Sequence, residues 1–371
     1  MANIMDYLDW RGDLDFTVSP FSEVDNLILS ELVYVDFQGI IPPPGEGEIS
    51  ISEANRIFFS RHTEEEINAR VSSTRMAAFL MQKMADTKRF GEIRLADYIN
   101  DISLDEQSQF CAMTVDLSDG YRNVVFSGTD STIVGWKEDF NMSFLEETPG
   151  QQKAVEYLNG VAGLYVEPLR VMGHSKGGNH SIYSAIHSSP RVMDRIRAIY
   201  NNDGPGFTEN MLALPGYQRL LPCIHSIVPE YSIVGMMFEH RESYKVVASS
   251  ENRAGQHDVM SWEVKGTELV HLSDVDGRAL LLDKTMKSWL EGMDGPRREA
   301  FVDTIFGILE EADIRTVDDL ANMNAAKFVE ILKLHSSLNK EDQELLLESL
   351  WSFFEQSGRE LKRALFSKTK C

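Results

Sequence analysis

Cysteine is scarce in this chain of 371 residues, which contains only Cys111, Cys223 and Cys371. Three cysteines at such wide separations form neither a disulfide framework nor a CxxC metal motif, so a reducing compartment fits best. The sequence also lacks any run of about eighteen apolar residues, the length that crosses a bilayer. Its first residues are acidic where a signal peptide needs a basic segment followed by an apolar one. We therefore expect a soluble, cytoplasmic protein.

Positive charge is also in short supply, because 36 lysines and arginines face 58 aspartates and glutamates and leave a net charge of −22. A surface this acidic repels nucleic-acid phosphates and anionic lipid headgroups. It argues against nucleic acid as a partner and against stable membrane anchoring. The chain has no HExxH, GxGxxG or P-loop motif in a fitting context, so we expect neither a metal nor a cofactor.

The spacing of hydrophobic residues divides the chain into an α/β region, 1–280, and a helical C-terminal region, 281–371. Helical spacing predicts N-terminal helices over 25–35 and 63–87, and two β-rich runs joined at 118–121 predict a hairpin. Strands are then predicted at 169–172, 196–200, 223–228 and 243–249, alternating with helices at about 151–161 and 176–188. This alternation is typical of a mostly parallel sheet flanked by helices. The C-terminal region is interpreted as a helical cap, with a homodimer or partner surface as the alternative.

A GxSxG motif interrupts this alternation at Gly173-His174-Ser175-Lys176-Gly177, after the strand LRVM and before the helical NHSIYSAIHSS. A serine hydroxyl becomes an effective nucleophile when a sharp strand-to-helix turn holds it exposed, and the flanking glycines relieve crowding there. The helix behind Ser175 also directs backbone N–H groups at a developing oxyanion. We expect an α/β-hydrolase fold with Ser175 as nucleophile, and His174 packed into the interior.

Two segments resemble the class 3, fungal-type lipases. One is the GHSxGG elbow with its upstream helix KAVEYLNGV. The other, VVFSGTDSTIVGWKEDF, is similar to their oxyanion strand ending in FRGT or FRGS and a lid segment with WxxD. The resemblance covers about 111–257 and implies an oxyanion hole formed by the backbone N–H groups of Thr129 and Lys176. Those lipases have arginine at the position of Ser127 and leucine at that of Lys176. The whole chain is more similar still to a bacterial hydrolase family, common in Gram-positive gut bacteria, that is catalogued as a domain of unknown function.

Chain order narrows the choice of the catalytic base and acid, because α/β-hydrolase triads run serine, acid, histidine. Five histidines follow the elbow: His225, His240, His257, His271 and His335. His257 is preferred because it lies in a loop after the last predicted core strand, within reach of Ser175, and His240 is second. Asp203 ends the strand after the elbow helix, in a segment similar to the acid loop of pancreatic-type lipases. Glu230 follows the next strand, where class 3 lipases place their aspartate, so it remains open as the alternative acid.

These residues predict a serine hydrolase that cleaves a carboxylic ester, with a small-molecule or lipid ester as substrate. An acyltransferase with the same triad, or a non-catalytic binding protein on a hydrolase scaffold, is the alternative. Methionines and leucines in 206–221 and 233–238 suggest an apolar acyl pocket, although core packing explains them equally well.

Overall fold

The centre of the molecule is a nine-stranded sheet in the order β1-β2-β3-β4-β5-β6-β7-β8-β11. The computed structural model describes residues 1–70, 73–130, 132–142, 145–277, 279–280, 295–311 and 314–316. The sheet strands are β1 (Glu48–Ser50), β2 (Arg94–Ser103), β3 (Ser108–Asp116), β4 (Arg122–Phe126), β5 (Leu169–His174), β6 (Ile196–Asn202), β7 (Ile224–Pro229), β8 (Tyr244–Val247) and β11 (His271–Leu272). Neighbouring strands from β4 to β8 are parallel, and the pairs at both edges are antiparallel. The predicted α/β-hydrolase architecture is confirmed, with a parallel centre and antiparallel margins.

Helices cover both faces of the sheet. The longer ones are α1 (Ile4–Arg11), α2 (Glu23–Leu32), α3 (Ile51–Arg61), α5 (Met76–Ala85), α6 (Ile133–Asn141), α7 (Pro149–Leu164), α8 (Lys176–His187) and α13 (Gly295–Glu311). Shorter ones are α4 (Glu64–Asn68), α9 (Pro190–Met193), α10 (Glu209–Leu212) and α11 (Pro215–Leu220), and β9 (Val264–Lys265) pairs with β10 (Glu268–Leu269) outside the main sheet. The sheet and its helices therefore form three layers.

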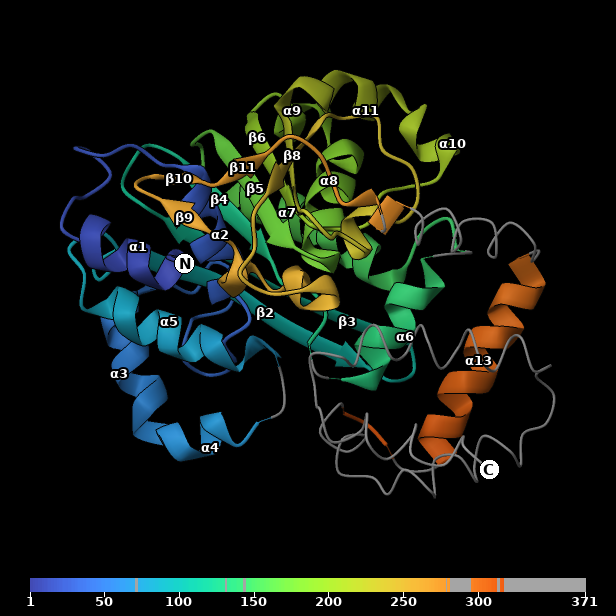
Figure 1. Cartoon of the computed structure of the whole chain (residues 1–371), viewed down its shortest axis with the longest axis horizontal. Helices are drawn as coiled ribbons and strands as arrows, with labels where there is room; N and C mark the ends of the chain where they lie inside the picture. Colours follow the sequence, from blue (N-terminus) through green and yellow to red (C-terminus); the bar gives the residue numbers. More distant parts are fainter. Residues whose placement is uncertain are drawn as a thin grey trace.

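The strand order decides which helices cover which face. Parallel strands β4 to β8 follow one another in chain order, so right-handed crossovers bring their connecting helices to one face. There α7, α8 and α11 pack on Val124, Val171 and Ile199. The opposite face, which carries Val125 and Met172, is covered by α1, α2, α3 and α5. Figure 1 shows the N-terminal helices gathered on one side of the sheet and α9 to α11 on the other.

The N-terminal helices are joined to the centre of the sheet by buried polar contacts. The Asn26 side chain on α2 donates a hydrogen bond to the Asn202 side chain at the end of β6, at 2.8 Å. Asp25 forms an ion pair of 2.7 Å with Arg89, and both side chains are fully buried. Because these polar groups are satisfied only when α2 is in place, the N-terminal segment belongs to the hydrolase core.

Local sequence patterns correctly predict a hairpin and one of the two N-terminal helices. The predicted hairpin at 118–121 is confirmed as the β3–β4 pair, and the predicted N-terminal helix at 25–35 is α2. The prediction of one helix over 63–87 is wrong, because α4 ends at Asn68 and α5 begins at Met76. The intervening residues are rich in serine and threonine, whose hydroxyls compete with helical hydrogen bonds. Thr63 caps α4 through a capping box with Glu66.

Of the region 281–371, the structure describes α13 and residues 314–316. Helix α13 lies against α6, where Lys137 forms an ion pair of 3.0 Å with Asp303 and the rings of Phe140 and Phe306 are 5.8 Å apart. These contacts attach α13 to α6 of the α/β region. His335 and the rest of the predicted helical region after residue 316 lie outside the described residues, and the domain boundary at 280 remains a prediction.

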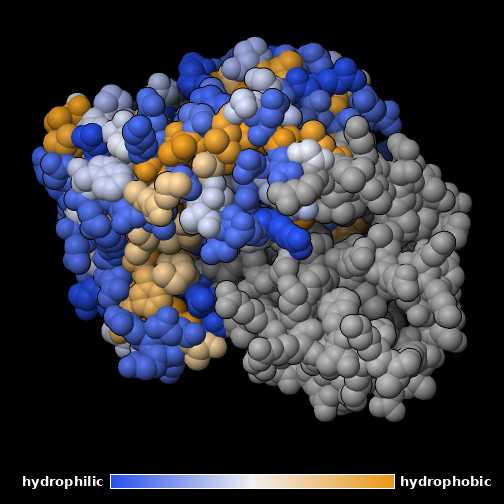
Figure 2. Space-filling model, viewed as in Figure 1, coloured by the Kyte–Doolittle hydropathy of each residue, from blue (hydrophilic) through white to orange (hydrophobic). Residues whose placement is uncertain are grey.

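The described surface in Figure 2 is largely hydrophilic, in keeping with the net charge of −22. Within the described ranges, no helix is both long enough and apolar enough to span a bilayer.

Candidate active site

Ser175 lies at a sharp turn between β5, which ends at His174, and α8, which begins at Lys176. Its φ is 57° and its ψ is −130°, a conformation that costs a residue with a side chain about 1–3 kcal/mol. The flanking residues Gly173 and Gly177 leave room for the backbone at this turn. A Cβ on Gly173 would lie 2.3 Å from the Gly177 carbonyl carbon, and one on Gly177 would lie 2.2 Å from the Phe126 carbonyl oxygen. The glycines of GxSxG are thus required by backbone packing.

His257 bridges Ser175 and Asp203. Its Nε2 is 3.0 Å from Ser175 Oγ, and its Nδ1 is 2.6 Å from Asp203 Oδ2. Asp203 follows β6, has a φ of 52° and is 1% exposed. Its other oxygen, Oδ1, accepts hydrogen bonds from the Ser232 hydroxyl and from the backbone N–H of Gly235. The carboxylate is therefore held so that one oxygen faces the imidazole.

The alternative acid and bases lie elsewhere. Glu230 follows β7 as expected, but it is exposed, and His257 Nδ1 is bonded to Asp203. His240 pairs with Glu242 at 3.0 Å, and His225 stacks on Tyr200 with ring centres 5.1 Å apart. His271 is 3.3 Å from Glu23 at the sheet edge. Of the expected candidates that the structure describes, it brings together Ser175, Asp203 and His257.

The segment after β4 packs closely against the elbow. A Cβ on Gly128 would lie 3.1 Å from the Ser175 Cβ and 2.6 Å from the His174 carbonyl oxygen, so only glycine fits. This approach brings Thr129, the next residue, beside the nucleophile. Lys176 is the first residue of α8, and its N–H has no carbonyl partner within the helix. Of the two residues expected to form the oxyanion hole, Lys176 therefore directly follows Ser175 at the start of α8, and Thr129 lies in the segment after the neighbouring strand β4.

Thr129 is also tied to α6, because its hydroxyl donates to Asp139 Oδ2 at 2.5 Å. Asp139 Oδ1 is buried without a hydrogen-bond partner among the described residues. Burial raises the pKa of Asp139 from its ordinary value of 3.8 to about 6. A carboxyl that titrates near neutrality thus lies next to the expected oxyanion residue.

The Lys176 side chain leaves the site and runs into the interior. Its ammonium donates to Gln109 O at 2.9 Å, Gln109 Oε1 at 2.7 Å and Glu138 Oε2 at 3.0 Å. Glu138, on α6, also accepts from the backbone N–H groups of Gln109 and Gly150. Burial disfavours both charges, but their attraction outweighs it, lowering the pKa of Glu138 and raising that of Lys176. The pair is ionised and ties α6 to the elbow.

His174 is buried, as expected, but it also makes specific hydrogen bonds that the sequence did not indicate. Its Nε2 is 2.8 Å from the backbone oxygen of His257, and its Nδ1 is 3.0 Å from the Tyr34 hydroxyl. A carbonyl oxygen can only accept, so Nε2 carries the proton and Nδ1 accepts from Tyr34. Burial lowers the pKa of His174 well below 6.5, which keeps the ring neutral. Tyr34, His174 and the His257 loop thus form one hydrogen-bonded chain.

The structure shows what some of the side chains suggested for an apolar acyl pocket contact. Met211 and Leu212 are buried in the core under α8, and Met236 packs against Val228 and Val246. Core packing, the equal alternative, is therefore the better interpretation of these side chains. Within the described residues, no group of histidine, cysteine, aspartate and glutamate could hold a metal ion.

The mixed sheet and its strand-to-helix elbow define an α/β-hydrolase fold. The chain belongs to the Mbeg1-like family, whose profile matches residues 84–307. The chain is also similar to a crystal structure of M37 lipase, with 13% identity and a TM-score of 0.37 over 70% of this chain and 83% of that one. No curated protein matches the chain.

Proposed function

We propose that the protein is a serine hydrolase that cleaves carboxylic esters through an acyl-enzyme on Ser175. The observation that carries the proposal is the position of His257, 3.0 Å from Ser175 Oγ on one side and 2.6 Å from Asp203 on the other. A serine that is held at a strained turn and bonded to an oriented imidazole is the arrangement that nucleophilic catalysis needs.

In the proposed reaction, Ser175 Oγ attacks the ester carbonyl while His257 Nε2 takes the hydroxyl proton. His257 then gives that proton to the leaving alcohol oxygen as the carbon–oxygen bond breaks. Water, deprotonated by His257, hydrolyses the acyl-enzyme by the same steps in reverse. Asp203 keeps the proton of the neutral ring on Nδ1 and stabilises the imidazolium. The backbone N–H groups of Thr129 and Lys176 would stabilise the oxyanion.

A fluorophosphonate probe tests the nucleophile directly, because it reacts with activated serines. We expect labelling of the wild-type protein at Ser175, no labelling of Ser175→Ala, and unchanged labelling of Ser189→Ala, a control at an exposed serine. Turnover of p-nitrophenyl esters of increasing chain length should depend on the same residue. A folded protein that neither labels nor hydrolyses any ester would contradict the proposal and favour a binding role. An added alcohol or amine that becomes acylated would identify acyl transfer instead.

A further inference from the structure

A cavity of about 400 Å³ adjoins the candidate active site on the side of the oxyanion segment. Ser127 and Asp130 line it, and they directly precede and follow Gly128 and Thr129. Tyr34 lines it as well, and its hydroxyl is bonded to His174 beside the nucleophile. A cavity of this size is within the range that binds small molecules.

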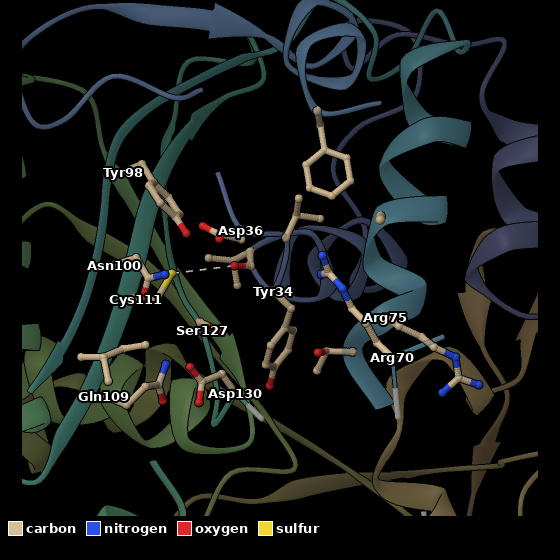
Figure 3. Close-up of a pocket in the computed structure, with 16 residues that line it drawn as sticks. Tyr34, Asp36, Arg70, Arg75, Tyr98, Asn100, Gln109, Cys111, Ser127 and Asp130 are labelled. Carbon is tan, nitrogen blue, oxygen red and sulfur yellow. Dashed lines mark hydrogen bonds between the residues drawn. The ribbon is translucent and has the colours of Figure 1, made fainter. Parts of the chain in front are cut away.

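The inner wall of the cavity carries uncharged hydrogen-bonding groups beside apolar residues such as Val33, Phe58 and Ile102. On the paired strands β2 and β3, Asn100 lies opposite Cys111 and Ile102 opposite Gln109, so these side chains share one face. Tyr98, two residues before Asn100, joins them, and Figure 3 shows these polar side chains along one side of the cavity. Burial raises the pKa of the Cys111 thiol to about 12 and that of Tyr98 higher still, so both groups are neutral.

The rim of the cavity is charged with both signs. Arg70 and Arg75 lie on one side, and Asp36 and Asp130 lie toward the other (Figure 3). A hydrocarbon chain in this space would strip water from the side-chain amide of Asn100 and offer no hydrogen bonds in return. A buried polar group that loses its hydrogen bonds in this way costs about 1–3 kcal/mol. The lining therefore favours a ligand with its own donors and acceptors.

The cavity lies on the acyl side of the expected reaction. The leaving alcohol takes its proton from His257 Nε2, so it must leave on the side of the His257 loop. None of the described residues that line the cavity belongs to the segment 253–261 that carries His257. The acyl group stays attached to the carbonyl carbon, so it is the part of the ester that would lie on the side of the oxyanion segment, toward this cavity.

We propose that this cavity binds a polar acyl group rich in amide or hydroxyl functions, so that the enzyme prefers polar acyl esters to those of fatty acids. The inference rests on the proposed function and adds the substrate class. Asn100 is the residue to test, because it is half-buried on the inner wall and leucine is close to it in shape.

The experiment compares two p-nitrophenyl esters with acyl chains of equal length, the N-acetylglycinate and the pentanoate. Each kcat/KM is divided by the ester's rate of hydrolysis by hydroxide, which removes the difference in intrinsic reactivity. We expect the wild-type enzyme to prefer the N-acetylglycinate at least about tenfold, the effect of one or more hydrogen bonds. Asn100→Leu should lower the preference about tenfold. Asn210→Leu, a control at an exposed amide on α10, should not change it.

The outcomes separate the two proposals. A corrected preference for the pentanoate, or a preference that Asn100→Leu leaves unchanged, would overturn the assignment of the cavity while the serine hydrolase proposal stands. No turnover of either ester, together with no fluorophosphonate labelling of Ser175, would overturn the proposed function and this inference with it.

Discussion

The buried ion pair between Lys176 and Glu138 allows a quantitative test of how α6 is attached to the nucleophile elbow. The Lys176 and Glu138 side chains are 1% and 0% exposed, and all three ammonium hydrogens and both carboxylate oxygens have partners. Removing one member leaves the other as an uncompensated buried charge, which costs about 3–5 kcal/mol. We expect Lys176→Met and Glu138→Gln each to lower Tm by at least roughly 5 °C.

The double variant should be less destabilised than the sum of the two single losses, because it leaves no charge unpaired. A coupling of at least about 2 kcal/mol is expected from urea unfolding of the four proteins. Arg56→Met is the matched control, since its ion pair with Glu53 is exposed and contributes little to stability. The reasoning is refuted if Lys176→Met costs no more than Arg56→Met, or if the two single losses simply add.

Three further predictions concern the residues around Ser175. Replacing Asp203 by asparagine keeps the shape of the side chain but favours the wrong imidazole tautomer, so kcat for an ester should fall by at least about 10³. Glu230→Gln should lower kcat less than about tenfold, and the opposite ranking in equally folded proteins would reverse the assignment of the acid. His174→Phe removes the hydrogen bond to the His257 backbone, and a shift of the base by about 1 Å costs roughly 10² in kcat with little change in KM; a kcat within twofold of wild type would show that His174 only packs. Asp139 has a folded-state pKa of about 6 against an ordinary 3.8, so the folded protein binds its proton more tightly, and the resulting stabilisation is complete below about pH 4 and lost as pH rises through 6. Asp139→Asn should therefore raise the free energy of unfolding at pH 8 by up to about 3 kcal/mol, seen as a higher Tm, and change it little at pH 4. An Asn variant that shifts Tm equally at both pH values would contradict the burial argument.

The residues of the candidate triad were accessible from the sequence because each has a local signal. Ser175 lies in GxSxG between a strand and a helix, and Asp203 and His257 each follow a predicted strand. The contacts that hold them were not accessible. Tyr34 bonds to His174 across 140 residues and Lys176 to Glu138 across 38, and no periodicity reports such distant pairs.

Two features of the fold were missed for related reasons. Strand β2 was not predicted because its alternation is interrupted between Ala96 and Ile99 by a bulge, where Asp97 has a φ of 57°. The covering of the second sheet face by N-terminal helices was not predicted either. The order of strands β4 to β8 brings all their crossover helices to the face that carries Val124 and Val171, so the N-terminal helices cover the opposite face. Local sequence patterns do not predict strand order, because it depends on the whole chain.

The attachment of α2 to β6 has a consequence for the synthesis of the protein. Asn26 finds its partner Asn202 only 176 residues later in the chain, and Trp10 finds the Gly266 carbonyl 256 residues later. At about 5–20 residues per second, roughly 10–35 s pass on the ribosome between Asn26 and Asn202. During that time the apolar residues of α2 lack the sheet that buries them. We expect the core to fold slowly, and only after β6 has been synthesised. Nascent chains that end before β6 should therefore be prone to aggregate.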